Sequence, residues 1–274
     1  MRGIKFGLSD TSIQDSTDRV ILPVMDGLAM AAFSTPGGTG KNYSQNRDGA
    51  LKEHGTVTQN AYSKSFSSTA DYIDTGLIDN SDFTALIVSR PEEIISPYVF
   101  QPIFGNWNRT TVESGKGVGL GSGIVAGSGG KVTLLASSVP EADAGNANAT
   151  TGKRENRDVF GLGHNGSWRF MAVRITKDKS FFKDFTKNVE SPSTAMTTGY
   201  VKDNRLTTPL LISGGYLESS ALATTMPGPE NALLIFYRRG LSGDEMESMY
   251  EWAKKYCSRR NITICLISFL SCYF

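Results

Sequence analysis

The sequence predicts an all-β protein of a size that is common for a single sandwich of antiparallel sheets, with one amphipathic helix near the C-terminus. Three observations lead to this prediction. The chain holds 29 glycines among 274 residues, and stretches rich in Gly, Ser, Thr and Asn separate short apolar runs, which is typical of strands joined by turns. Hydrophobic residues make up 39% of the chain, enough for one large core. A clear helical repeat of apolar residues begins only after residue 241.

Apolar segments of strand length follow one another along the chain. We expect strands within residues 83–89, 98–107, 131–136, 158–163, 168–175, 181–185, 207–212 and 231–237. Residues 83–88 are almost continuously apolar, which is typical of a strand buried on both faces. Glycine alternates with apolar residues over 117–125, and closely approaching strands explain this alternation better than a dinucleotide-binding loop does.

Two stretches between these strands carry further predictions. Asn165-Gly166 is a strong hairpin signal, so we expect residues 158–163 and 168–175 to pair with each other. Residues 137–157 read SSVPEADAGNANATTGKRENR and predict a long exposed loop. Long loops on a rigid scaffold often carry function.

The segment 230–261 predicts a buried strand that leads directly into the helix. Residues 231–237 are apolar and aromatic, and Ser242 follows as a good N-cap, with Glu245 completing a capping box. Leu241 and Met246 stand where a hydrophobic staple would place them. The helix is expected over 242–260, with an apolar face made of Met246, Met249, Tyr250, Ala253, Tyr256 and Cys257.

We expect three parts in the chain. Residues 1–20 are polar and are predicted to form an N-terminal arm. Residues 21–261 are predicted to form the sandwich together with its helix. Residues 262–274, ITICLISFLSCYF, are predicted to form an apolar tail that is too short to span a membrane.

Several stretches resemble one known family. They are SFSSTADYIDTG at 65–76, FTALIVSRP at 83–91, SWRFMAVRIT at 167–176, LISGG at 211–215 and LIFYRRGLS at 234–242, the last followed by Glu245, Met246 and Tyr250. In this order they resemble segments of concanavalin A-like lectin/glucanase domains of the laminin G-like kind. The resemblance spans roughly residues 56–252. It implies a jelly-roll sandwich of the type seen in bacteriophage structural proteins.

The charge and the cysteines exclude several classes of protein. The formal net charge is +1, so no overall field favours nucleic acid as a partner. No run approaches the ~20 apolar residues that a membrane span needs. Cys257, Cys265 and Cys272 all lie in the last eighteen residues, so we expect the body of the chain to fold without disulfides. The first six residues lack the apolar core of a signal peptide, which predicts synthesis in a cytoplasm.

Candidate catalytic groups are few. A glycosidase on this fold needs two carboxylates ~5–10 Å apart. The nearest match to such a pair is Glu141-Ala142-Asp143, in the hydrophilic stretch rather than on a strand. His54 and His164 have no nucleophile motif around them. We therefore predict that the chain is not an enzyme and assign no catalytic residue.

Calcium would need several oxygen ligands that converge from loops. No Asp-x-Asp-x-Asp-Gly loop occurs, so we expect no cofactor, and a structural calcium ion has no support beyond residue type. The candidate ligands by type are Asp143, Asn146, Asn148 and Asp158, with Asp71 and Asp74 as alternates.

A carbohydrate site would need an aromatic face for a sugar ring together with amide and carboxylate groups for its hydroxyls. The turn at 106–109 has the aromatic ring and the amides, and the hydrophilic stretch adds a carboxylate and further amides. The predicted carbohydrate-binding residues are Asn106, Trp107, Asn108, Arg109, Asp143, Asn146 and Asn148.

A lectin-like sandwich without a signal peptide or disulfides predicts a non-catalytic structural or adhesin component of a bacteriophage or prophage virion, such as a tail, fibre or surface decoration. Its expected partners are other virion proteins, further copies of itself and host-surface carbohydrate, but neither nucleic acid nor a membrane. Its expected location is the virion, after synthesis in the host cytoplasm. Two alternatives remain: a carbohydrate-active hydrolase on the same fold, and a purely structural packing module of the virion.

Overall fold

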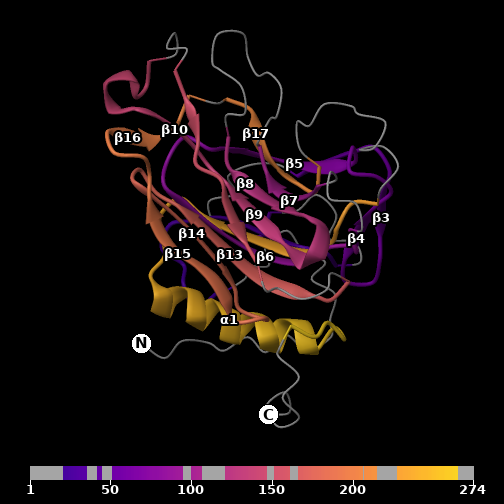
Figure 1. Cartoon of the computed structure of the whole chain (residues 1–274). Helices are drawn as coiled ribbons and strands as arrows, with labels where there is room; N and C mark the ends of the chain where they lie inside the picture. The colour runs from indigo at the N-terminus through magenta and orange to yellow at the C-terminus, as the bar shows by residue number, and fades with distance from the viewer. Residues whose placement is uncertain are drawn as a thin grey trace.

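The strands form two large antiparallel sheets that stack face to face, and a helix covers the outer face of one of them (Figure 1). The computed structural model describes residues 21–35, 42–44, 51–94, 100–106, 121–146, 151–160, 166–205, 207–214 and 227–264. Within these ranges the chain is mostly strand, with one α-helix at the C-terminal end. The predicted all-β sandwich with its C-terminal helix is confirmed.

The sheet beneath the helix is called the helix-side sheet. Its strands, in spatial order, are β15 (Val189–Ala195), β14 (Lys179–Asp184), β13 (Arg169–Ile175), β6 (Phe83–Arg90), β18 (Glu230–Tyr237), β4 (Lys64–Phe66) and β3 (Val57–Gln59). Strand β1 (Leu28–Phe33) also pairs with β18, on the same edge as β4. The last long strand of the chain therefore sits between segments that all come from its first third.

The other large sheet is called the outer sheet. Its strands, in spatial order, are β12 (Arg157–Val159), β9 (Val132–Leu135), β8 (Gly123–Ala126), β7 (Gln101–Gly105), β17 (Pro209–Ile212), β5 (Tyr72–Ile78) and β2 (Lys52–His54). A small third sheet consists of β11 (Lys153–Arg154), β10 (Ser137–Pro140) and β16 (Tyr200–Lys202). Two short 3₁₀ turns, η1 (Ser128–Gly130) and η2 (Glu141–Asp143), and helix α1 (Gly243–Ser258) complete the described elements.

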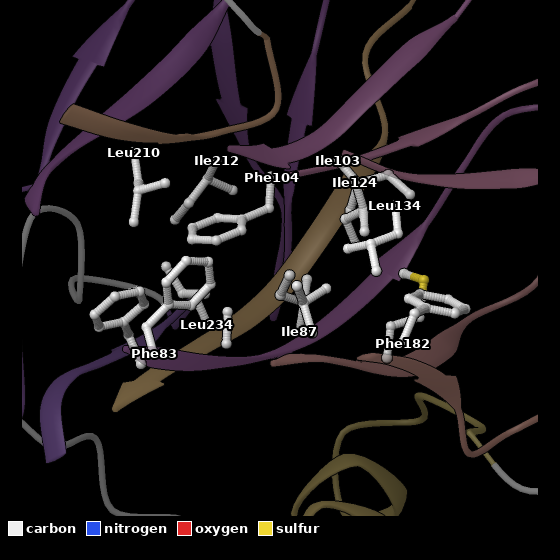
Figure 2. Close-up of a cluster of buried hydrophobic side chains, with 14 of the residues drawn as sticks. Phe83, Ile87, Ile103, Phe104, Ile124, Leu134, Phe182, Leu210, Ile212 and Leu234 are labelled. Atoms are coloured by element: carbon white, nitrogen blue, oxygen red, sulfur yellow. The ribbon is translucent and has the colours of Figure 1, made fainter. Parts of the chain in front are cut away.

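Strand β6 is buried on both faces, as its apolar sequence predicts. Phe83 and Ile87 point into the apolar core between the two large sheets, whereas Leu86 and Val88 point into a second core beneath the helix. Figure 2 shows the core between the sheets, where residues of the helix-side sheet face a layer of residues from the outer sheet that includes Ile103, Phe104, Ile124, Leu134, Leu210 and Ile212. Side chains alternate along a strand, so a strand between two cores needs apolar residues at successive positions.

Helix α1 begins as the sequence predicts. The Ser242 hydroxyl accepts a hydrogen bond from the Glu245 N–H, and the Glu245 carboxylate accepts one from the Ser242 N–H (2.8 Å), so the capping box is complete. Arg239 also binds this carboxylate (Nη2 to Oε1, 2.6 Å). The Arg239 hydrogen bond, with the one from Ser242, lowers the pKa of Glu245 to about 2. All six residues predicted for the apolar face of the helix are buried.

The predicted hairpin between residues 158–163 and 168–175 is wrong. Strand β12 pairs with β9 in the outer sheet, and β13 pairs with β6 and β14 in the helix-side sheet. Strand β13 is buried on both faces and needs a central position, whereas β12 turns only Val159 into the core between the sheets. On its other side, Asp158 accepts a hydrogen bond from Thr133 (2.6 Å). Burial therefore outweighs the local turn signal.

The prediction of one exposed loop over 137–157 is also wrong at its beginning. Residues 137–140 form β10, and Ser137 and Ser138 are buried despite their polarity. The Ser137 hydroxyl donates to the Gly121 carbonyl (3.0 Å), and the Ser138 hydroxyl donates to the Glu155 carboxylate (2.8 Å). Buried hydroxyls with partners are tolerated inside proteins, so polarity alone is a poor guide to exposure here.

The alternation of glycine with apolar residues has the cause that we expected from residue 121 on, and its first part, 117–120, lies outside the described residues. Gly105 on β7 lies opposite Gly123 on β8, and Gly105 has a positive φ of 141°. A Cβ atom on Gly105 would collide with the Ser122 carbonyl oxygen, and one on Gly123 would collide with the Phe104 carbonyl oxygen. The two strands can approach this closely only where neither residue carries a side chain.

We expect Ser242→Ala to lower the free energy of unfolding by about 1 kcal/mol, because the Glu245 N–H would lose its acceptor at the start of the helix. Urea denaturation followed by circular dichroism measures this change. Ser258→Ala, at the exposed last turn of the same helix, is the matched control and should change stability by less than about 0.5 kcal/mol. Equal effects of the two substitutions would show that the capping box does not stabilise the fold.

Candidate functional site

A buried ion pair holds part of the hydrophilic stretch in place. The Arg205 guanidinium binds the Asp203 carboxylate through two nitrogens, at 2.9 Å each, and both side chains are fully buried. Arg205 also donates to the Thr151 carbonyl (2.7 Å), and the Thr151 hydroxyl donates to Asp143 (2.6 Å). Asp143, one of the predicted site residues, is therefore fixed by a cation that lies sixty-two residues away in the sequence.

Asn106, another predicted site residue, is joined to the same region. Its N–H donates to the Ser122 carbonyl and its Oδ1 accepts from the Ser122 N–H, both at 2.9 Å. The adjacent Gly121 carbonyl accepts from the Ser137 hydroxyl, and the Ser137 carbonyl accepts from the Asp203 N–H (2.9 Å). Hydrogen bonds thus connect the two segments predicted to bind carbohydrate at one end of the sandwich.

Asn106 itself is fully buried. Besides its bonds with Ser122, its side-chain NH₂ donates to the Thr208 carbonyl (3.0 Å). In the structure this amide ties the end of β7 to the segments before β8 and β17. Its proposed contact with carbohydrate stays a prediction.

An aromatic ring lies beside the fixed loop. Tyr200 on β16 is half-buried and lies opposite Pro140 in register. The Lys153 ammonium sits 4.4 Å from the centre of the Tyr200 ring, in a cation–π contact, and Lys153 is exposed. We call Asp143, Thr151, Lys153, Tyr200, Asp203 and Arg205 the loop-end site. It lies around the small sheet, at the upper left of Figure 1.

The rest of η2 and the turn after it is open to solvent. Glu141 is exposed and forms an ion pair with Lys177 (2.8 Å), which lowers the pKa of the Glu141 carboxyl. Asn146, a predicted site residue, is exposed, and its N–H donates to the Asp143 carbonyl (3.0 Å). A carboxylate and an amide of this segment thus face water.

Further buried charges anchor the small sheet to the main sandwich. The Lys202 ammonium binds the Asp79 carboxylate and donates to the Ser81 carbonyl (2.6 Å) at the junction of β5 and β6. Glu155 is buried and accepts hydrogen bonds from the Ser138 hydroxyl and from the Thr197 N–H (3.0 Å). Each charge has a compensating partner, which a buried charge requires. The small sheet is therefore a fixed platform for the loop-end site.

The remaining predicted site residues lie outside the described part of the chain. They are Trp107, Asn108, Arg109 and Asn148. Their proposed contacts with carbohydrate stay predictions.

Among the described residues, no group of three or more His, Cys, Asp or Glu side chains could hold a metal ion. Three of the candidate calcium ligands have other partners. Of the two alternates, Asp71 accepts from the Thr56 N–H (3.0 Å) and the Ser68 N–H (2.7 Å), and Asp74 accepts from the Gly76 N–H (2.8 Å). Asp158, a first-choice candidate, pairs with Lys131 (3.2 Å). In the same part of the chain, no helix has the length and apolarity needed to cross a membrane.

One carboxyl has a pKa in the range of a general acid, but it lies away from any surface. Asp184 is completely buried between the two large sheets, and this burial raises its pKa to about 6 against the charge of Arg169, whose Nε is 3.8 Å away. Because neither side chain is exposed, this pair belongs to the core and cannot meet a dissolved substrate.

Sequence reasoning missed Tyr200, Lys153, Asp203 and Arg205. The one local signal is the polar segment Lys202-Asp203-Asn204-Arg205, which begins at the last residue of β16 and contains two of these four residues. An Asp and an Arg two residues apart can pair, but their contact with residue 151 depends on how distant strands meet. A single sequence contains no pattern from which the contact between Arg205 and Thr151 could be predicted.

Comparisons with known proteins bear on the fold. No family model matches the chain, and no curated protein matches it. Similar solved structures include Trypanosoma rangeli sialidase in complex with sialic acid, at 11% identity and a TM-score of 0.57, covering 84% of this chain and 33% of the sialidase. The binding domain of botulinum neurotoxin serotype D is 10% identical, with a TM-score of 0.57, and the match covers 84% of this chain and 53% of that one.

A third similar structure is that of botulinum neurotoxin type C, a toxin whose cell entry is described as dependent on interaction with two ganglioside molecules. It is 10% identical to this chain, with a TM-score of 0.54. That match covers 82% of this chain and 51% of the neurotoxin chain. The chain thus spans about a third to a half of these proteins. At such identities the likeness shows the fold alone, and it supports the lectin-like sandwich that the family resemblance implied.

The prediction that the chain is not an enzyme is contradicted by these comparisons. Several of the similar structures are sialidases, including one described as a covalent intermediate with difluorosialic acid. The prediction rested on the lack of a carboxylate pair along a strand, and that pattern does not cover every glycosidase, since sialidases use a tyrosine nucleophile.

We expect stability to fall as pH rises from about 4 to about 6, because folded Asp184 keeps its proton over a range in which the unfolded carboxyl has lost it. The folded pKa is about 6 and the ordinary value is 3.8, so the folded state binds more protons in this window. The effect should be roughly 2–3 kcal/mol and should be fully lost above the folded pKa.

Urea denaturation of the wild type and of Asp184→Asn between pH 4 and pH 7 measures this effect. The amide cannot titrate, so the difference in free energy of unfolding between the two proteins should change across the window. Parallel pH profiles would show that Asp184 titrates alike in the folded and unfolded chains.

Proposed function

We propose that this chain binds carbohydrate at the loop-end site. The observation that carries the proposal is the position of Tyr200, Lys153 and Thr151 above the buried pair of Arg205 and Asp203. A half-buried aromatic ring offers a face on which a sugar ring can stack. The hydroxyl, carboxylate and ammonium groups around it can exchange hydrogen bonds with sugar hydroxyls.

The rigidity of the loop-end site favours specific binding. The Arg205–Asp203 pair fixes Thr151, which in turn holds Asp143, so the polar groups are positioned before a ligand arrives. Pre-positioned groups lose little freedom on binding, and this raises affinity. The resemblance of the fold to proteins described with sialic acid and gangliosides is a second, independent support.

The setting of this function is part of the proposal. We propose that the protein is a tail, fibre or surface component of a bacteriophage or prophage virion, that it assembles with other virion proteins and with copies of itself, and that its ligand is a glycan of the host surface. The supports are the sequence resemblance to domains found in such particles and a body of the chain without cysteine. Mass spectrometry and electron microscopy of purified particles test this setting, and absence of the chain from every particle would contradict it.

Tyr200→Ala should lower the affinity for a bound glycan by about tenfold, because the stacking face would be lost. A glycan array identifies the ligand, and titration calorimetry measures its affinity. Tyr72→Ala, at a half-buried tyrosine on the opposite end of β5 from Asp79, is the matched control and should leave the affinity unchanged. Trp107→Ala, measured in parallel, tests the aromatic residue that the sequence alone suggested.

Binding that survives Tyr200→Ala would remove the loop-end site from the proposal, and a wild-type protein that binds no glycan would contradict the proposed function. Because sialidases share the fold, the same preparation should be incubated with a fluorogenic sialoside. Release of the fluorophore would add hydrolysis to binding.

A further inference from the structure

A lysine covers one face of the Tyr200 ring in the loop-end site. Lys153 lies opposite Ser138 on β10, and Tyr200 lies opposite Pro140 on the same strand. Positions 138 and 140 are two apart, so all four side chains leave the small sheet on one face. There the Lys153 ammonium reaches over the Tyr200 ring, 4.4 Å from its centre. Because Lys153 is itself exposed, this face of the ring borders solvent, and a sugar that stacks on it must displace the ammonium.

The positive charge of Lys153 is not held by a carboxylate in the described part of the chain. Its recorded contact there is the one with the Tyr200 ring. The neighbouring lysines differ, because Lys202 binds Asp79 and Lys177 binds Glu141. A cation–π contact at an exposed site is weak. The Lys153 ammonium can therefore leave the ring for a negatively charged partner.

Asp143 is the carboxylate of the loop-end site whose charge could oppose an acidic ligand. It accepts a hydrogen bond from the Thr151 hydroxyl (2.6 Å). The hydrogen bond to Asp203 raises the pKa of the Arg205 guanidinium, and the negative charge of Asp143 adds to this rise. Asp143 therefore shares the cation Arg205 with Asp203, and the charge of Lys153 remains available to a ligand.

Neutral and acidic sugars differ in what they offer the displaced ammonium. A neutral sugar that stacks on Tyr200 removes the cation–π contact and leaves the Lys153 charge to water. An acidic sugar presents a carboxylate or a sulfate, so a new ionic contact replaces the one that is lost. The lysine ammonium is a compact charge on a flexible four-carbon stem, so it can follow the edge of a stacked sugar ring. The arrangement thus favours an acidic sugar over a neutral one of the same shape.

We propose that the loop-end site selects acidic sugars, which carry a carboxylate or a sulfate, and that Lys153 determines this specificity. The sugar ring takes the place over Tyr200 that the ammonium occupies in the structure, and the ammonium moves to the anionic group of the sugar. Asp143 and Thr151 remain beside the ring for the sugar hydroxyls. This inference rests on the proposed function, because it names the class of ligand for the same site.

The first test compares pairs of glycans that differ only in the anionic group. A glycan array carries sialylated glycans beside their methyl esters, and sulfated glycans beside their unsulfated parents, so the two sources of negative charge are distinguished. Titration calorimetry of the full chain then measures the pair with the strongest signal. We expect the acidic member to bind about fivefold more tightly, as a solvent-exposed ion pair allows. Equal binding within every pair, or a preference for the neutral members, would overturn the inference.

Lys153→Gln should change the affinities for the two members of a pair in opposite directions. The affinity for the acidic glycan should fall about fivefold, because the ionic contact is lost. The affinity for the neutral glycan should rise about twofold, because no cation–π contact has to be broken before the sugar stacks. A lysine that merely supported the fold would lower both affinities alike, so a parallel fall, or no change in either, counts against the proposed role.

The matched control is Lys254→Gln. The Lys254 ammonium lies 4.8 Å from the centre of the Tyr250 ring, in the same kind of contact, but on α1 at the opposite side of the sandwich from the small sheet (Figure 1). This substitution should leave both affinities unchanged. Acidic and neutral glycans that bind equally, with binding lost in Tyr200→Ala, would refute the role of Lys153 and leave the proposed function in place. A wild-type chain that binds neither kind would refute both.

Discussion

Strand β18 imposes the constraint on which the rest of the structure depends. All eight of its residues are buried, because one face meets the core between the sheets and the other meets α1. No backbone group of such a strand can reach water, so both of its edges need partners. Strand β6 provides one edge, and β1 and β4 share the other. The first and last thirds of the chain are thereby joined in one sheet.

The helix is part of the same solution. Strand β18 ends at Tyr237, whose hydroxyl donates to the Val24 carbonyl (2.9 Å), and α1 begins six residues later. Its apolar face then covers residues of the helix-side sheet that would otherwise be exposed. The strand that completes the helix-side sheet is thus followed in the sequence by the helix that covers this sheet. A capping box and the Arg239–Glu245 pair fix the point at which the chain turns.

The features of the fold and of the candidate site that could be predicted from the sequence are those that depend on residues close together in the chain. The helix, its cap and the two-sided burial of β6 follow from patterns within about ten residues, and all three are present. The pairing of β12 with β9 was missed because it depends on which faces must be buried, and the Asn165-Gly166 signal is local. The loop-end site was found in part. Asp143 is polar and recognisable, whereas Arg205 acquires its role only when it reaches Thr151.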